Sequence, residues 1–286
     1  MTSRTAMSPD LTLDYLGVGP NDRAGCLALL EAPLSPAAAT VHEYLAERLG
    51  SADDSVPDLG TDELAVTEHD WLAGMLFFVP AILEWHAGRT IPDAVSRATL
   101  ADFGRQMAIN RRVHNRFGMD TYKWLNHLFS GRIYQLGRLQ YLIHQPAAAI
   151  PGVGADEWIL GVHIPEGGGL GAAAVQESLA LARPFFAEHF ADKPARTANC
   201  ESWLLDPYLS EQLEPGANIA AFAALFTPYR EPRDEPTDAV YFTFRTRSMD
   251  NLDALPRATA LQRIVLERID AGGAWQLGFG SMELPR

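Results

Sequence analysis

The stretch from residue 157 to residue 190 constrains the fold more than any other part of the chain. It begins with an apolar run from Trp158 to Ile164 whose side chains alternate as they do in a strand buried on at least one face. Pro165 ends the run, and glycines follow. From residue 175 on, apolar residues recur every three or four positions, which is the helical period, and Pro184 inside this pattern predicts a bend or a break. The sequence therefore predicts a strand, a glycine-rich turn and a helix in succession.

Four glycines in this turn, Gly167, Gly168, Gly169 and Gly171, favour an anion site at the start of the helix. A helix N-terminus presents free backbone N–H groups and the positive end of the helix dipole, and glycines let an anion approach the backbone closely. The spacing is neither that of a nucleoside-triphosphate loop, because no Lys-Ser/Thr pair follows, nor a complete dinucleotide fingerprint. Two alternatives stay open, a pyrophosphate cradle and a flexible surface turn.

The composition indicates a globular protein with a sizeable core, because 47% of the 286 residues are apolar and 21% are charged. That length allows one large domain or two ordinary ones. The net charge of −13 makes the chain a poor general ligand for nucleic acid or for an anionic membrane. The longest apolar run, residues 74–83, is interrupted by Pro80 and falls short of the ~20 residues of a membrane span. The N-terminus lacks an apolar secretory core, so we expect a cytoplasmic protein.

The cysteines and histidines give no sign of a metal centre. Cys26 and Cys200 are the only two cysteines, and two cannot build a disulfide framework. His163 and Glu166 form an H-x-x-E pair, but two ligands do not make a metal site. We therefore expect a protein without a metal.

The first 130 residues are predicted to be mainly helical. Ser35 before Pro36 is a typical helix start, and Thr67 with Asp70 forms a capping box that opens a long apolar helix reaching residue 85. Further helical patterns lie between residues 100 and 118 and after Asp120. We take residues 1–130 as a helical N-terminal domain.

The pattern changes at residue 131. Residues 132–143 alternate with period two and predict one strand that is bent or bulged at Gly137. The prediction for the rest of residues 131–286 is an α/β domain with a central mixed sheet flanked by helices. Its later elements are, in order, a strand at 196–205, a short helix opened by Asp206-Pro207, a segment at 218–226 that could be helix or strand with helix favoured, a loop at 227–238, a strand at 240–245, a helix after residue 256 that ends at residue 272, and a strand at 275–284.

This order of elements resembles the core of the GNAT-type N-acetyltransferase fold. Three segments resemble more closely a bacterial group of acyltransferase-like proteins that have a helical N-terminal domain and a GNAT-like C-terminal domain. They are G-R-I-Y-Q-L-G-R-L-Q-Y (131–141), V-H-I-P-E-G-G (162–168) and S-W-L-L-D-P (202–207). The resemblance implies an acyl-CoA-dependent N-acyltransferase, with acetyl-CoA or another acyl-CoA as co-substrate and a small molecule or peptide as the acceptor.

The resemblance also implies how the acyl-CoA is held. The strand that carries Val162 to Ile164 should diverge from the strand that carries Ser202 to Leu205, and the thioester arm of CoA should lie in the gap. The family's loop has Gln or Arg where this chain has Glu166, and a carboxylate would repel phosphate. The CoA-binding residues implied are Ile164, Gly167, Gly168, Gly169, Leu170 and Gly171.

Acyl transfer to an amine needs a base for the amine proton and an acid for the leaving thiolate. His163 and Glu166 are the candidate bases, and Tyr208, at the start of the helix after Pro207, is the candidate acid. Each of these residues is more often a structural residue in such a position. The candidate acceptor-binding residues are Arg132, which together with Arg138 could clamp an anion, and Trp124, Ser202 and Trp203.

A second function is compatible with the same pattern. Because Glu166 replaces a basic or amide residue, the chain could be a non-catalytic GNAT-like protein that binds a small ligand or a partner. We expect a small-molecule acceptor and neither nucleic acid nor membrane as a partner, and we leave a homodimer open.

Overall fold

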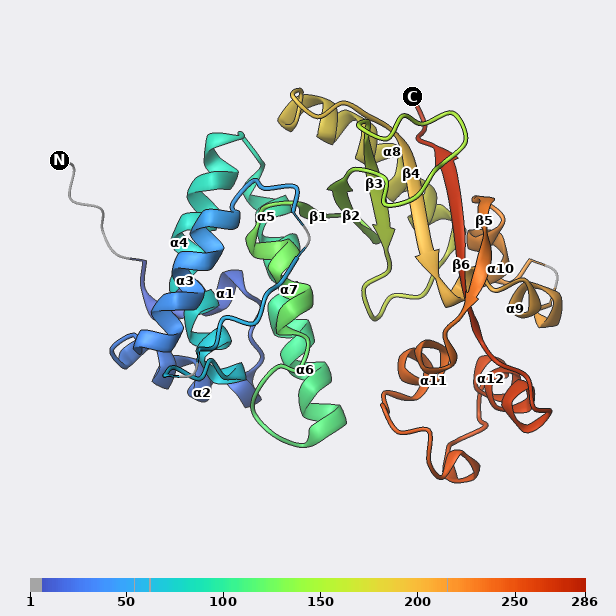
Figure 1. Cartoon of the computed structure of the whole chain (residues 1–286), viewed down its shortest axis with the longest axis horizontal. Helices are drawn as coiled ribbons and strands as arrows, with labels where there is room; N and C mark the ends of the chain where they lie inside the picture. The colour runs from blue at the N-terminus through green and yellow to red at the C-terminus, as the bar shows by residue number, and fades with distance from the viewer. Residues whose placement is uncertain (1–6, 54, 62, 215) are drawn as a thin grey trace. The chain divides into compact units, whose positions relative to one another are not determined.

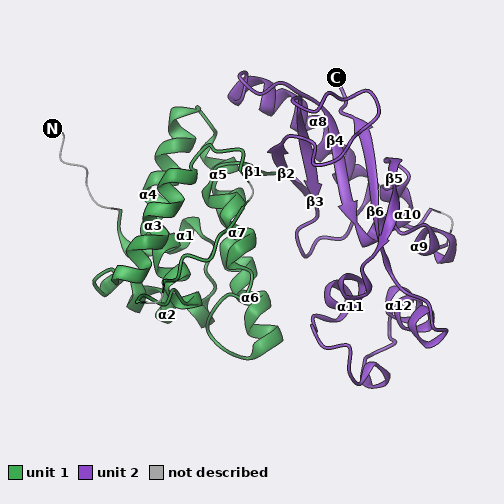
Figure 2. Cartoon of the chain, in the orientation of Figure 1, with its two compact units in different colours: residues 1–136 green, residues 137–286 purple. Residues whose placement is uncertain are grey.

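The computed structural model describes residues 7–53, 55–61, 63–214 and 216–286. The chain divides into two compact units, Met1–Leu136 and Gly137–Arg286 (Figure 2). The sequence places the domain boundary after residue 130, and that boundary stays a prediction. Helices dominate the first unit and a mixed sheet with helices makes up the second, which confirms the predicted fold class.

Unit 1 consists of seven helices and a terminal strand within the described residues. Helix α4 is its central element, because ten of its residues are buried. The elements are α1 (Pro9–Tyr15), α2 (Pro20–Glu31), α3 (Pro36–Arg48), α4 (Glu68–Gly88), α5 (Asp93–Leu100), α6 (Asp102–His114), α7 (Tyr122–Phe129) and β1 (Ile133–Leu136) (Figure 1).

The capping signals in this unit are confirmed. The Ser35 hydroxyl accepts a hydrogen bond from the N–H of Ala38 at 3.0 Å, and the Thr67 side chain accepts one from the N–H of Asp70 at 3.4 Å. Asp70 in turn accepts from the N–H of Thr67 at 3.0 Å, which completes the capping box. These bonds satisfy N–H groups that a helix start would otherwise leave without a partner.

Helix α4 is long and apolar enough to cross a membrane by length and composition alone. In its most apolar window, 56% of the segment is buried inside the protein, as in the core helix of a globular domain. Helices α2 and α3, bent by 97° at their junction, pass the same test only if they are counted together as one broken span.

Unit 2 contains the predicted strand, glycine turn and helix as β3, the turn and α8, and α8 packs against β2 and β4. The strand order of the sheet is β1-β2-β3-β4-β6-β5. Strands β3 and β4 are parallel, whereas β2–β3, β4–β6 and β5–β6 are antiparallel. The elements of unit 2 are β2 (Leu139–His144), β3 (Trp158–His163), α8 (Ala172–His189), β4 (Ala195–Ser202), η1 (Trp203–Leu205), α9 (Pro207–Gln212), α10 (Asn218–Ala223), β5 (Thr227–Asp234), α11 (Pro236–Phe244), η2 (Leu252–Ala254), α12 (Ala260–Asp270) and β6 (Gln276–Glu283) (Figure 1).

Helix α8 runs without a break through Pro184, so the predicted break there is wrong. A proline inside a helix costs ~3 kcal/mol. Phe185 and Phe186 directly after it are both buried, and burial of one such side chain contributes roughly 1.5–3 kcal/mol. The packing of this turn therefore offsets the lost hydrogen bond.

Three other predictions in unit 2 need correction. Residues 132–143 form two strands and not one, because Gly137 has a left-handed φ of 64° and turns the chain between β1 and β2. Residues 240–244 belong to helix α11, where Pro236 occupies the first turn together with Asp238, and Arg245 is the left-handed residue that ends the helix. Residues 227–234 form β5, which lies at the edge of the sheet, the one place where its prolines are tolerated.

Candidate active site

Strands β3 and β4 separate before either strand ends. Their ladder runs from Trp158 opposite Ala195 to Gly161 opposite Asn199, and no pairing between them is recorded beyond that point in the described residues. Strand β3 nevertheless continues to His163, and β4 continues to Ser202 while paired with β6. We call this divergence the fork. The resemblance implied a divergence between Val162–Ile164 and a strand at Ser202–Leu205; β4 instead ends at Ser202, and residues 203–205 form the short helix η1.

The glycine loop begins directly beyond the fork. Gly167, Gly168 and Gly169 have φ angles of 92°, 73° and 61°, which side chains rarely adopt. Gly171 precedes α8 without any side-chain cap. Within the described part of the chain, no hydrogen bond is donated by the backbone N–H groups of residues 167–171. The loop therefore presents open amides at the start of an 18-residue helix, as the sequence predicts for an anion cradle.

Two arginines set the charge of this loop. The Arg138 side chain donates from Nε to the carbonyl of Gly169. Arg245, at the end of α11, places Nε 3.1 Å from Oε1 of Glu166. Glu166, the residue expected to repel phosphate, is therefore paired with a cation, and Arg138 adds a further positive charge beside the glycines.

The remaining predicted CoA-binding residues, Ile164 and Leu170, flank the exposed glycines of the loop. Ile164 is half-buried directly after β3, and Leu170 is buried inside the loop. Leu170 anchors the loop in the core, while the flanking glycines Gly167, Gly168 and Gly169 stay exposed.

The two faces of the sheet differ at the fork. Tyr141 and its cross-strand partner Val162 face α8, because the Tyr141 hydroxyl lies 3.1 Å from the Ser178 hydroxyl of that helix. Alternate residues point the other way. We call this second surface the polar face; it carries Gln140 and His144 of β2, His163 of β3, and Asn199 and Glu201 of β4.

Two imidazoles of the polar face converge on Gly161, where the fork opens. A Cβ atom at Gly161 would lie 3.1 Å from Nε2 of His144 and 3.4 Å from Nε2 of His163. Because Gly161 has no side chain, His144 can reach across β3, and its Nε2 lies 3.0 Å from Oδ1 of Asn199. His163, a predicted base, thus lies half-buried at the fork beside a second histidine.

The bonds of His144 fix its protons. Its Nδ1 lies 2.8 Å from the carbonyl of Gln145, which can only accept, so Nδ1 carries a hydrogen. With that hydrogen on Nδ1, the neutral ring can only accept at Nε2, so the Asn199 side chain would present its amide nitrogen to it.

A tyrosine completes the polar face. The Tyr229 hydroxyl of β5 donates to Oε1 of Glu201 at 3.2 Å. Burial raises the pKa of Tyr229 to about 12, so the phenol keeps its proton at neutral pH. The face therefore holds a protonated hydroxyl as well as imidazoles.

The predicted residues at the end of β4 and directly after it make contacts within unit 2. The Ser202 hydroxyl accepts from the N–H of Leu204 at 3.1 Å, and Trp203 is buried with its ring edge-on to Trp275. Tyr208 lies 5.9 Å from the Trp275 ring, and the Arg268 guanidinium covers it at 4.3 Å. Asp206 caps α9, as predicted, by accepting from the N–H of Tyr208 at 2.9 Å.

Arg132, predicted to clamp a substrate anion, is instead built into unit 1. It is 1% exposed, and it donates to the carbonyl of Ala52 at 3.1 Å and to the Ser130 hydroxyl at 3.2 Å. Its Nη2 lies 2.8 Å from Nδ1 of His127. Arg132 and Arg138 are also separated by the Gly137 turn and do not share one strand, so the predicted arginine pair is wrong.

Trp124, the other candidate substrate residue of unit 1, also has internal partners. Its Nε1 donates to Oδ2 of Asp102 at 3.4 Å, and its ring packs edge-on against His127.

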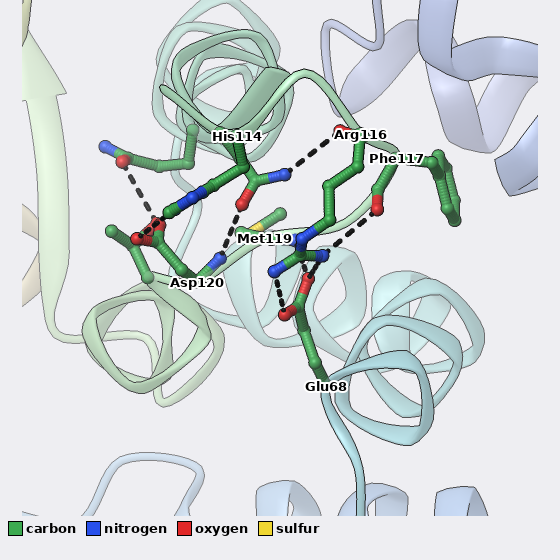
Figure 3. Close-up of polar contacts among 9 residues, drawn as sticks. Glu68, His114, Arg116, Phe117, Met119 and Asp120 are labelled. Atoms are coloured by element: carbon green, nitrogen blue, oxygen red, sulfur yellow. Dashed lines mark hydrogen bonds and ion pairs between the residues drawn. The ribbon is translucent and has the colours of Figure 1, made fainter. Parts of the chain in front are cut away.

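A further polar cluster in unit 1 surrounds Glu68 (Figure 3). Arg116 places its two terminal nitrogens 2.8 and 2.7 Å from the two carboxylate oxygens of Glu68, which also accepts from the N–H of Met119. His114 lies 3.0 Å from Asp120 in the same cluster. These contacts tie the loop between α6 and α7 to the start of α4, and they occupy both oxygens of the carboxylate.

A hollow of about 520 Å³ lies elsewhere in unit 2, between α9, α10, β5 and β6. Its walls are mostly apolar, with Leu205, Phe226 and Phe279 among them, and none of its lining residues is a histidine or cysteine. The chemistry of acyl transfer is therefore better supported at the fork.

Within the described residues, no group of three or more His, Cys, Asp and Glu side chains could hold a metal ion. Cys26 and Cys200 are both buried, and burial raises the pKa of each thiol to about 12. Neither cysteine is therefore an activated nucleophile.

The sequence analysis did not identify four residues of this site: His144, Asn199, Tyr229 and Arg245. Alternation within β3 places Gly161 on the face of His163, but the position of His144 on that face depends on the register of β2 against β3. The positions of Asn199 and Tyr229 at the site follow from strand register. The position of Arg245 follows from helix α11, a segment that the sequence analysis predicted to be a strand. No local pattern contains that information.

Two family models together span nearly the whole chain. A model described as N-acyltransferase N-terminal domain matches residues 7–131, and one described as GNAT-like C-terminal domain matches residues 133–282. No curated protein matches the chain.

Several solved structures are similar over almost the full length. One is an acyltransferase in complex with decanoyl-CoA and teicoplanin, with 32% identity, a TM-score of 0.84, and coverage of 99% of this chain and 89% of that one. The same values hold for an acyltransferase in complex with CoA and 10C-teicoplanin. An acyltransferase mutant in complex with octanoyl-CoA is 32% identical with a TM-score of 0.83, and the match covers 96% of this chain and 86% of that one.

Proposed function

Because this chain belongs to the family that joins an N-acyltransferase N-terminal domain to a GNAT-like C-terminal domain, it is an acyl-CoA-dependent acyltransferase, and we propose that it moves a medium-length acyl chain to the amine of a small molecule. The observation that carries the proposal is the fork, with open amides on one side and two imidazoles on the other. Cytoplasmic location and a homodimer stay predictions.

The chain length and the acceptor class are supported by the similar structures. Those acyltransferases are in complex with octanoyl-CoA, decanoyl-CoA and teicoplanin. We therefore propose a donor chain of about that length and an amine-bearing small molecule as the acceptor.

We assign the pyrophosphate of CoA to the open N–H groups of Gly168 to Gly171. Backbone donors at a helix start bind anions well, and the Arg138 guanidinium beside them adds a charge-assisted contact. Glu166 acts as an anchor in this assignment, because it holds Arg245 against the loop. This pairing removes the reason for the alternative of a non-catalytic protein, which rested on an uncompensated Glu166.

We assign the role of base to His163. The thioester would lie in the fork, and the acceptor amine would approach from the polar face. The amine nitrogen attacks the thioester carbonyl carbon, a C–N bond forms, the C–S bond breaks, and His163 takes the amine proton. Glu166, the other predicted base, is held by Arg245 instead.

The CoA thiolate then needs a proton, and two phenols are candidates. Tyr208 is the residue that the resemblance implies, and it stands at the start of α9 against Trp275. Tyr229 lies on the polar face and is protonated at neutral pH.

The test is the release of free CoA thiol from decanoyl-CoA in the presence of amines, with teicoplanin freed of its acyl chain among them. We expect titration calorimetry to detect decanoyl-CoA binding, and thiol release to depend on the amine. Absence of binding by both CoA and decanoyl-CoA would overturn the proposal. Faster turnover of acetyl-CoA than of decanoyl-CoA would overturn the chain length alone.

A further inference from the structure

Gln140 of β2 carries a buried amide nitrogen that has no hydrogen-bond partner among the described residues. It is 2% exposed, and its Nε2 is fully buried without a hydrogen-bond partner in the described part of the chain. Gln140 lies directly opposite His163 in the β2–β3 ladder, so both side chains point to the polar face. An amide without a partner thus lies beside the residue that we assign as the base.

Such an amide is unfavourable unless something else bonds to it. A buried polar group without a hydrogen bond destabilises the fold, and an apolar side chain of the same size would fit better. The other polar side chains of the polar face have contacts: His144 lies against Asn199, and Glu201 accepts from Tyr229. Gln140 is the exception among them, which indicates a ligand atom in the functional complex.

The strand order decides which ligand that atom belongs to. The order is β2-β3-β4, and the fork lies between β3 and β4. An acyl-CoA thioester in the fork is therefore on one side of His163, and Gln140 is on the other. Gln140 thus lies on the side of His163 away from the thioester, which is the side left for an acceptor that lies across the polar face.

We propose that Gln140 determines acceptor specificity by donating a hydrogen bond from Nε2 to an oxygen atom of the acyl acceptor, close to the amine that His163 deprotonates. This inference rests on the proposed function and adds the class of acceptor. The preferred substrates are amines with a hydroxyl, ether or carbonyl oxygen near the nitrogen, such as amino alcohols and amino sugars. A plain alkyl amine would leave the amide unpaired in the complex, and sites of this kind reject such analogues strongly.

The experiment compares two amines that differ by one hydroxyl, trans-2-aminocyclohexanol and cyclohexylamine, with decanoyl-CoA as the donor. The ratio of their kcat/KM values is measured for the wild-type chain and for Gln140→Leu, with Gln140→Met as a second variant of similar volume. For the wild type we expect a ratio of about 10 to 100 in favour of the amino alcohol, in keeping with the cost of one unpaired buried donor. For both variants we expect a ratio within threefold of one.

Two further readouts separate specificity from structure. The melting temperature of Gln140→Leu should be equal to or above that of the wild type, because the substitution removes an unpaired buried amide. The Kd for decanoyl-CoA should not change. The matched control is Gln145→Leu, because Gln145 already donates to the carbonyl of Asp156 at 3.0 Å. That control should keep the wild-type ratio.

An unchanged ratio in Gln140→Leu and Gln140→Met would overturn the inference, and so would a melting temperature several degrees below the wild type for both variants. Failure of the proposed function looks different. In that case the wild-type chain releases no thiol from decanoyl-CoA with either amine. If only this inference fails, amine-dependent thiol release remains, and substitution of residue 140 does not change the ratio between the two amines.

Discussion

The Arg132 cluster of unit 1 and the fork of unit 2 are built from the same kinds of residue, yet only the fork is open. Arg132 is surrounded by Ser130, His127 and the carbonyl of Ala52, and every nitrogen of its guanidinium has a partner. At the fork, the amides of the glycine loop are open and Gln140 lacks a partner in the described residues. Between these two clusters, closure by internal hydrogen bonds marks the structural one, and residue type does not.

The Glu68 cluster supports the same distinction. Its carboxylate is held by both nitrogens of Arg116 (Figure 3). The N–H of Met119 adds a further hydrogen bond to the same carboxylate, so both of its oxygens have internal partners. By contrast, the ion pair of Glu166 and Arg245 borders the open amides of residues 167–171.

The largest expected effect is the fall in kcat when His163 at the open site is substituted. Because removal of a general base costs typically about 10²–10⁴-fold in rate, His163→Gln should lower kcat by that factor. The Kd for decanoyl-CoA should stay within threefold of the wild type. Thiol release and titration calorimetry measure the two quantities, and a kcat within tenfold of the wild type would remove His163 from the mechanism.

A matched pair of arginine variants tests the comparison itself. Arg132→Met should lower the free energy of unfolding by about 3 kcal/mol, because it leaves buried acceptors unpaired, without changing the Kd for CoA. Arg138→Met should do the reverse, with a roughly tenfold weaker Kd for CoA and little change in stability. Urea denaturation and calorimetry provide both readouts, and an exchange of the two outcomes would refute the assignment of closed and open sites.

Acid should act on the interior of unit 1 through His86, which is buried. Burial lowers the pKa of His86 from 6.5 to about 4, so the folded chain keeps this imidazole neutral. The unfolded chain binds the proton more readily below pH 6.5. The stabilisation is therefore complete above pH 6.5 and is lost as the pH falls towards 4, by about 3 kcal/mol in total.

Unfolding free energies measured by urea between pH 7 and pH 4 check this prediction. His86→Gln should flatten the pH dependence, because the variant has no group to titrate at that position. An equally steep fall in the variant would assign the acid sensitivity to other groups.

The smallest expected effect is on stability and CoA binding when a glycine of the loop at residues 167–171 is substituted. Gly169 has a φ of 61° and open space around its Cβ position, so Gly169→Ala should cost about 1 kcal/mol in backbone strain and weaken CoA binding about tenfold. Gly272→Ala is the control, because Gly272 has a φ of 77° and equally open space at the end of α12. It should cost similar stability and leave the Kd for CoA unchanged; a parallel loss of binding in both variants would speak against a cradle at residues 167–171.

The parts of the fold that could be predicted are those set by local chemistry. The Thr67–Asp70 capping box and the glycine turn before α8 each depend on residues within a few positions of one another. Helix α11 was missed because its aromatic and β-branched residues favour strands, whereas its start at Pro236 and the burial of Val240 stabilise a helix.

The site was only partly predictable for the same reason. The position of His163 at a strand end follows from the alternating pattern, but the approach of His144 to Asn199 requires the register of three strands. The pairing of Glu166 with Arg245 joins residues 79 positions apart. Sequence therefore indicated where CoA should lie and left out most of the side chains that surround the acceptor.

The central claim is that the fork and the glycine loop together hold an acyl-CoA. A crystal structure with decanoyl-CoA tests it most directly. We expect the pyrophosphate within hydrogen-bond distance of the N–H groups of Gly168 to Gly171, and the thioester between the ends of β3 and β4. A thioester bound anywhere else in the chain, or strands β3 and β4 paired to their ends in that complex, would contradict the account.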